Sequence, residues 1–303
     1  VLVLFLVGLM ASATLMLTEG VEDQAKYDET KRRMDIMRKA IVGDPTRTIN
    51  GSAEISGFAV DMGRLPECVR ELLEPLKCDG SALGTWSIDA ITGIGFGWRG
   101  PYIAVLPERN GEHRFRDGYA NSDAFDAQNS GWIFSADAST GIVSLTSQGF
   151  DLTNSADDIA DDALVIADDW RINSVYVKFI NQNASDALPS SNVDLNLRVY
   201  LSDPTNYVTG DDNINTALTV SSSAISASGE GDYLFHFDSS NAIPIGARGY
   251  AIVCYEVPTG DPNNYVVFDG DCNDASNAAP SSNDIKSFTV APRQNITLNW
   301  VIK

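Results

Sequence analysis

The sequence predicts an α+β fold in which a long N-terminal α-helix precedes a small α/β module and a C-terminal antiparallel β-sandwich. Three observations support this prediction. The first 18 residues carry no charge and the next 24 are highly charged, and no proline interrupts either stretch. A glycine-rich region with one short helical candidate follows. From about residue 131 onward, short segments alternate between apolar and polar residues, as strands with one buried face do.

The N-terminal helix is expected over residues 1–45, with an apolar half at 1–18 and an amphipathic half at 19–42. At about 1.5 Å per residue, the apolar half would span about 27 Å, slightly less than the ~30 Å hydrocarbon core of a bilayer. Helical spacing continues in the second half, and Gly43 and Pro45 then supply an end signal. Its apolar positions are Val21, Ala25, Met34, Met37, Ala40 and Ile41. The alternative is a signal peptide or a simple anchor, although no Lys or Arg precedes the apolar run.

Charges are segregated along this helix. Residues 19–29 are mainly acidic and residues 31–39 mainly basic, which suits the helix dipole. The acidic half of one helix could therefore face the basic half of an axially displaced neighbour. The same pattern is equally typical of a solvated helix surface.

Two further units are expected after the helix, a globular module at 46–162 and a β-sandwich at 163–303. The module contains a helical candidate at 66–76, where Pro66 suits the first turn. In the rest of the chain we expect strands at 141–147, 174–180, 193–201, 233–237, 250–257, 265–268, 285–290 and 296–302. Four cysteines form two pairs of near neighbours, Cys68 with Cys78 and Cys254 with Cys272, and we expect both pairs to be disulfides.

Composition disfavours several classes of function. A net charge of −20 argues against nucleic acid, because phosphate binding needs clustered Lys and Arg. Residues 95–100 match G-x-G-x-x-G, but Pro101 follows where a helix should begin, so we expect no nucleotide. Without Cys-x-x-Cys-His we expect no covalent haem. No catalytic motif was found, and we expect no enzyme activity.

Four short segments occur in an order that resembles type IV pilin-like proteins, including the major pseudopilins of type II secretion. They are DMGRLP at 61–66, GWRGPY at 97–102, RDGYAN at 116–121 and SQGFD at 147–151. With the N-terminal helix, they extend the resemblance over about the first 160 residues, so the module at 46–162 would be pilin-like. The C-terminal half resembles no domain that we can name.

The resemblance implies a structural subunit that is first inserted in the inner membrane and is then assembled into an extracellular helical homopolymer by inner-membrane machinery. Apolar helices would pack together in the filament core, where each buried large side chain contributes about 1.5–3 kcal/mol. The expected core positions are Val1, Leu4, Phe5, Gly8, Leu9, Ala13 and Leu17.

The chain departs from the family at the fifth helix position, where the family has a glutamate and this chain has Phe5. Aligning the family's mid-helix glycine with Gly8 would place that glutamate just before Val1. We therefore expect the mature protein to have a few residues before Val1. The alternative is a minor subunit at the filament tip, some of which lack the glutamate.

Calcium is the one cofactor that the sequence suggests. In major pseudopilins, the loop after the segment that corresponds to 147–151 binds calcium, and here Asp151, Asp157 and Asp158 lie in that loop. Carboxylates are suitable ligands for this hard cation. The alternative is a solvated acidic loop in an acidic protein.

Two other functions remain open. The chain could be a pseudopilin of a type II secretion system, which forms a short filament. It could instead be a membrane-tethered binding or adhesion module, whose C-terminal domain contacts a surface or a glycan through an aromatic patch near Trp170 or Tyr207.

Overall fold

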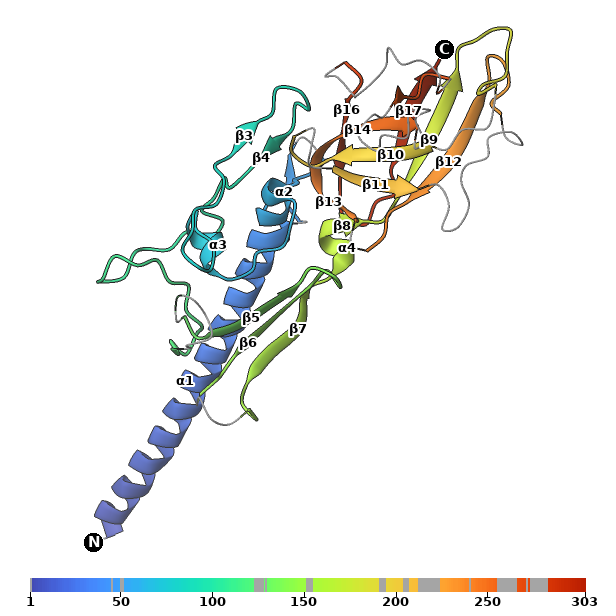
Figure 1. The fold of residues 1–303 in the computed structure, drawn as a ribbon. Helices are drawn as coiled ribbons and strands as arrows, with labels where there is room; N and C mark the ends of the chain where they lie inside the picture. The colour runs from blue at the N-terminus through green and yellow to red at the C-terminus, as the bar shows by residue number, and fades with distance from the viewer. Residues whose placement is uncertain are drawn as a thin grey trace.

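Figure 1 shows the computed structural model, in which one long helix leads into a mostly β structure. The structure describes residues 2–44, 46–49, 52–122, 128, 130–150, 155–190, 195–203, 207–211, 224–239, 241–254, 266–270, 272 and 283–303. For residues 2–20, 49, 52, 53 and 207–211 it describes the backbone only.

Helix α1 runs from Leu2 to Val42 and is 41 residues long. It ends where the sequence predicts, because Gly43 adopts a left-handed φ of 82° and donates its N–H to the carbonyl of Lys39. Gly57 also has positive φ, and a Cβ there would lie 2.8 Å from the carbonyl oxygen of Ile41. A glycine is therefore required where the chain passes back over the helix end.

Short elements fill the region between α1 and residue 130. They are the two-stranded pair β1 (Thr48–Ile49) and β2 (Ser52–Ala53), helices α2 (Phe58–Met62) and α3 (Arg70–Leu73), and the pair β3 (Ser87–Ile88) and β4 (Gly95–Phe96). The helical candidate at 66–76 is reduced to α3. Pro75 explains its end, since the residue before a proline avoids the helical region, and Glu74 is extended.

A three-stranded antiparallel sheet lies beside the middle of α1 (Figure 1). It consists of β5 (Trp132–Asp137), β6 (Ile142–Ser147) and β7 (Ile159–Val165), in that order. The expected boundary between residues 162 and 163 falls within β7. Helix α4 (Ala167–Trp170) and the small pair β8 (Arg171–Ile172) and β13 (Ile243–Pro244) then connect to the C-terminal half.

The C-terminal half contains one connected eight-stranded sheet. The strand order is β15-β14-β10-β11-β12-β9-β17, and β16 pairs with the part of β14 that β15 leaves open. The bounds are β9 Ser174–Asn181, β10 Leu195–Tyr200, β11 Tyr207–Asp211, β12 Glu230–His236, β14 Gly246–Cys254, β15 Val266–Val267, β16 Lys286–Val290 and β17 Thr297–Ile302. All eight segments expected as strands from residue 141 onward overlap an observed strand.

The predicted fold class was wrong. The described chain is mostly β, and apart from α1 its helices have only four or five residues. Small sheets and irregular chain replace the pilin-like α/β module at 46–162. Helices of four or five residues are not stable in isolation. In this glycine-rich region, few segments therefore form helices. The antiparallel sandwich is also incorrect, because β9 and β17 are parallel within the connected sheet.

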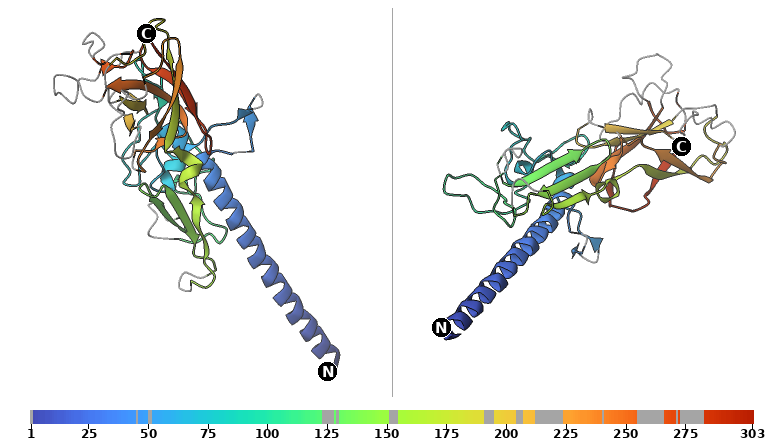
Figure 2. Two further views of the ribbon diagram at one scale, coloured as in Figure 1. Left: turned by 90° about the vertical axis from the view of Figure 1, so that its right-hand side faces the viewer. Right: turned by 90° about the horizontal axis from the view of Figure 1, so that it is seen from below.

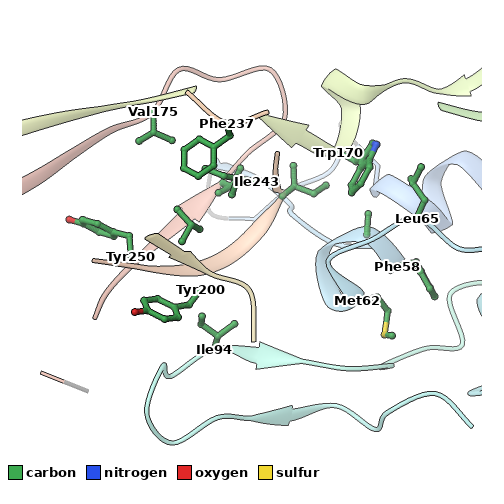
Figure 3. Close-up of a cluster of buried hydrophobic side chains, with 14 of the residues drawn as sticks. Phe58, Met62, Leu65, Ile94, Trp170, Val175, Tyr200, Phe237, Ile243 and Tyr250 are labelled. Atoms are coloured by element: carbon green, nitrogen blue, oxygen red, sulfur yellow. The ribbon is translucent and has the colours of Figure 1, made fainter. Parts of the chain in front are cut away.

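The core is continuous from α1 to the last strand. Figure 3 shows Phe58, Met62 and Leu65, from α2 and the following loop, in one buried cluster with Trp170, Ile243 and other side chains of the C-terminal half. Arg198 and Tyr200 of β10 occupy the polar positions of the alternating segment 193–201, yet both are buried. One reason is that the chain around Thr92 and Ile94 covers this face, where Thr92 Oγ donates to the carbonyl of Ser202.

Candidate assembly interface

Helix α1 has an exposed part and an anchored part. Among its described side chains, residues 21–25 are all exposed, and Val21 is 69% exposed. Burial begins at Thr30 and continues at Met34, Met37 and Ile41. Figure 2 shows in both views that the N-terminal part of α1 extends away from the rest of the molecule. The folded part therefore holds only the C-terminal part of this helix.

Apolar packing fixes the anchored part. Met37 and Ile41 are fully buried and Met34 is 2% exposed, at the spacing that puts them on one face of the helix. Each such side chain contributes about 1.5–3 kcal/mol relative to an exposed position. Met34, Met37 and Ile41, which the sequence singled out, thus hold α1 to the globular part. Val21, from the same pattern, is 69% exposed.

Polar contacts anchor the helix at two further points. Arg33 Nη1 donates to the carbonyl of Arg116 at 2.6 Å. Closer to the end of α1, Arg38 forms an ion pair with the buried Asp169 of α4 at 3.1 Å, and Asp169 also pairs with Arg293 at 2.7 Å. These contacts connect α1 to the 116–121 segment, to α4 and to the loop before β17.

The 116–121 segment rests directly on α1. The N–H of Gly118 donates to Thr30 Oγ at 3.0 Å, and the Thr30 hydroxyl donates to the carbonyl of Lys26 at 2.9 Å. A Cβ at Gly118 would lie 2.3 Å from the Lys26 carbonyl oxygen, closer than real Cβ contacts. The glycine of the RDGYAN segment is thus explained by close approach of the loop to the helix.

Two of the four family-like segments meet at Asp117, which is 1% exposed. Its carboxylate accepts hydrogen bonds from Ser147 Oγ at 2.6 Å and from the backbone and side-chain N–H groups of Asn121, both at 2.9 Å. Asn121 Nδ2 also donates to the carbonyl of Gly149 at 2.8 Å. The buried carboxylate is therefore well hydrogen-bonded, and it connects 116–121 to 147–151.

The other two segments meet around Asp61. The hydroxyl of Tyr102 donates to Asp61 Oδ2 at 3.1 Å, and the N–H of Gly97 donates to the Asp61 carbonyl at 3.0 Å. Burial raises the pKa of Asp61, while the Tyr102 hydrogen bond opposes this shift. Beside it, Arg64 makes a bidentate ion pair with the fully buried Glu71 at 2.8 and 2.9 Å.

Sequence reasoning missed a buried arginine that joins the two halves of the chain. Arg248 of β14 is 1% exposed and donates to the carbonyls of Pro244, Ile245 and Ala247, and to that of Val60 in α2 at 3.3 Å. Burial lowers its pKa to about 10. No local signal in the sequence distinguishes it from a surface arginine, because its partners are backbone carbonyls brought there by the fold.

The expected core positions of assembly are only partly described. Val1 lies outside the described residues, and the structure describes only the helical backbone of Leu4, Phe5, Gly8, Leu9, Ala13 and Leu17. Both expected disulfides, Cys68–Cys78 and Cys254–Cys272, are present. Trp170, considered for an aromatic binding patch, is buried and donates to the carbonyl of Gly141, and the side chain of Tyr207 is not described.

Two of the three expected calcium ligands lie within the described residues. Asp151 lies outside them, Asp158 is half-buried, and Asp157 Oδ2 accepts the N–H of Phe150 at 2.7 Å. Within the described chain, the metal-like group is Glu67, Glu71 and Cys78. This group does not suit a metal, because the Cys78 sulfur is in a disulfide and Glu71 pairs with Arg64.

Among the residues whose side chains are described, no helix combines the length and the apolar character needed to cross a membrane. Comparisons with protein families, with characterised proteins and with solved structures find no match to this chain. The resemblance to pilin-like proteins therefore depends on the residues alone.

Proposed function

We propose that this protein is a structural subunit of an extracellular type IV pilus-like filament and that it polymerises through the N-terminal part of α1. One observation carries this proposal. The 41-residue helix α1 is held by the globular part only from about Thr30 onward, and its other end extends into solvent.

The uncharged segment at 1–18 favours an apolar environment. Transfer of apolar side chains out of water is favourable, at roughly 25 cal/mol per Å². Within the described chain, nothing packs on the N-terminal part of α1 in Figures 1 and 2. A lipid bilayer or a bundle of neighbouring helices would satisfy this segment, and a subunit that leaves a membrane for a filament uses each in turn.

The anchored part of α1 suits the same role. A filament subunit must transmit load from its core helix to its exposed domain. Buried methionines, the Arg33 contact and the Arg38–Asp169–Arg293 ion pairs join α1 to both halves of the globular part. The two disulfides lie outside α1 and brace loops, as is common in proteins exposed to oxidising surroundings.

The direct test starts with the producing cells. Surface appendages are sheared off, the polypeptide is identified in them by mass spectrometry, and the fraction is imaged by cryo-electron microscopy with helical reconstruction. We expect long filaments whose core contains residues 1–18 of many subunits. If the cells bear appendages without this polypeptide, and it stays with the membrane as monomers or short oligomers, the filament proposal is wrong. A secretion pseudopilin or a tethered binding module would then be the explanation.

A pair of variants separates assembly from folding. Leu9→Glu places a charge in the uncharged segment, far along the helix from the anchored part, and we expect it to abolish filaments. Tyr176→Glu changes a 43% exposed residue of β9 and serves as the matched control. Both proteins should keep the urea unfolding midpoint of the wild type, because the N-terminal part of α1 extends away from the globular part and Tyr176 is exposed. Filaments from Leu9→Glu would contradict the proposal.

A further inference from the structure

A groove with four arginines lies along one flank of α1. It has a volume of about 520 Å³ and is formed by α1 on one side and by the chain at 102–106 and 114–116 on the other. We call it the arginine groove. The residues that matter here are Arg32, Arg33, Ile36, Leu106, Arg114 and Arg116.

The arginine groove concentrates basic side chains on an acidic protein. Its four arginines pair with three glutamates, Glu29, Glu108 and Glu112. The chain as a whole has a net charge of −20. Arg32 is the most accessible of the four, with 65% of its side chain exposed. A negatively charged partner is therefore favoured here over the rest of the surface.

The groove also has apolar surface. Leu106 at its rim is 89% exposed, and Ile36 of α1 is half-buried in its wall. An exposed leucine beside arginines suits a partner that is both acidic and apolar. An amphipathic helix presents these two properties together, and helices commonly bind in grooves in this way.

The preceding two turns of α1 have this complementary character. Between Val21 and Asp28, the helix carries three exposed carboxylates and a single lysine. They are Glu22, Asp23 and Asp28, and the lysine is Lys26. Val21 and Ala25, one turn apart, are both exposed. This segment cannot fold back into the groove of its own chain, because the same continuous helix forms the wall of that groove.

We propose that the 21–28 segment of one copy docks in the arginine groove of a second copy. This inference rests on the proposed function and specifies one contact of the polymer. The centre of the segment precedes the centre of the α1 wall of the groove by about nine residues. At 1.5 Å per residue, contacting copies would be displaced along the helix axis by about 14 Å.

Cysteine cross-linking tests the contact in the full-length protein. All four native cysteines are in disulfides, so introduced cysteines are the reactive thiols. In the double variant Val21→Cys/Leu106→Cys, we expect oxidation to link successive copies into a ladder of trimers and larger species on non-reducing gels. Each single variant can form dimers at most. The matched control Val21→Cys/Ile88→Cys places the second thiol on the distant β3, at a residue that is 62% exposed, and should form no ladder.

Charge reversal gives a second, independent readout. Arg32→Glu should raise the critical concentration for assembly about tenfold, which corresponds to ~1.4 kcal/mol per contact. Arg47→Glu is the control, because Arg47 is similarly exposed and is also paired with one glutamate, Glu54, but lies outside the groove. We expect it to assemble as the wild type does.

The outcomes separate the two proposals. Filaments without the Val21–Leu106 ladder, or with equal effects of Arg32→Glu and Arg47→Glu, overturn this contact and leave the proposed function intact. Absence of filaments from the wild-type protein under all conditions overturns the proposed function itself. A Val21–Leu106 ladder together with an axial displacement near 14 Å in the helical reconstruction supports both.

Discussion

Replacing Gly118 with alanine should loosen the loop that rests on α1. The added Cβ would lie 2.3 Å from the Lys26 carbonyl oxygen, 2.5 Å from Thr30 Oγ and 2.9 Å from the Thr30 nitrogen. Two of these three atoms belong to the helix backbone, which cannot rotate away. The loop would have to retreat by about 1 Å to restore ordinary contact distances, as overpacked sites generally do.

The expected cost has two parts. Overpacking of a well-packed site costs about 1–3 kcal/mol. Retreat of the loop also weakens the hydrogen bond from Gly118 N–H to Thr30 Oγ, whose net contribution is about 0.5–1.5 kcal/mol. We therefore expect Gly118→Ala to lower the free energy of unfolding by roughly 2–4 kcal/mol. A shift of the melting temperature by about 4–16 °C would follow for a protein of this size.

Urea unfolding of the full-length protein measures this effect, with hydrogen exchange of the Gly118 amide as a local readout. Gly84→Ala is the matched control, since no atom lies within 4 Å of its added Cβ and its φ is not positive. This variant should stay within about 0.5 kcal/mol of the wild type. Equal loss of stability in both variants would contradict a steric clash at Gly118, and so would a Gly118→Ala protein that unfolds at the wild-type midpoint with its amide protected.

Three further predictions concern charged groups. Arg248→Met should lower the free energy of unfolding by about 2–4 kcal/mol, because the carbonyls of Val60 and Ile245 lose their donor, and wild-type stability in urea would contradict this. Ion pairs with Arg32 and Arg33 lower the pKa of Glu29 to about 2. This pair-derived stability is present above pH 4.5 and is lost as the pH falls toward 2, so Glu29→Gln should cost about 1 kcal/mol at pH 6 and nothing near pH 2. A cost independent of pH would show that the ion pairs contribute nothing. The sequence-based calcium site at Asp151, Asp157 and Asp158 predicts a lower melting temperature in EGTA, and an unchanged temperature in wild type would reject that site.

The N-terminal helix and the strand positions could be predicted because their signals are local. Continuous helical spacing and a glycine stop describe α1, whose end at Val42 agrees with the sequence. Alternation of apolar and polar residues located the strands from 141 onward, since side chains of a strand alternate between two faces. The nearest cysteine pairings could likewise be inferred from their separation in the sequence.

Pairing direction and burial could not be predicted, because they depend on residues far apart in the sequence. Periodicity indicates which face of β9 is buried, but not that β17 is its parallel neighbour. Arg198 and Tyr200 occupy polar positions of their pattern, yet tertiary packing buries both, in part through the 92–94 chain beside β10. The fold-class prediction was wrong for the same reason.

The sequence by itself determined that an uncharged stretch is joined to a charged, amphipathic helix, and that the segment 116–121 contains a glycine. The tertiary structure decided what these features do. It showed that side-chain burial on α1 begins at Thr30 and that four arginines form a groove beside α1. It also showed that the loop at Gly118 approaches the helix backbone so closely that a side chain there would clash. Such properties arise from contacts between segments far apart in the sequence. A local pattern does not indicate which distant segment will pack against it.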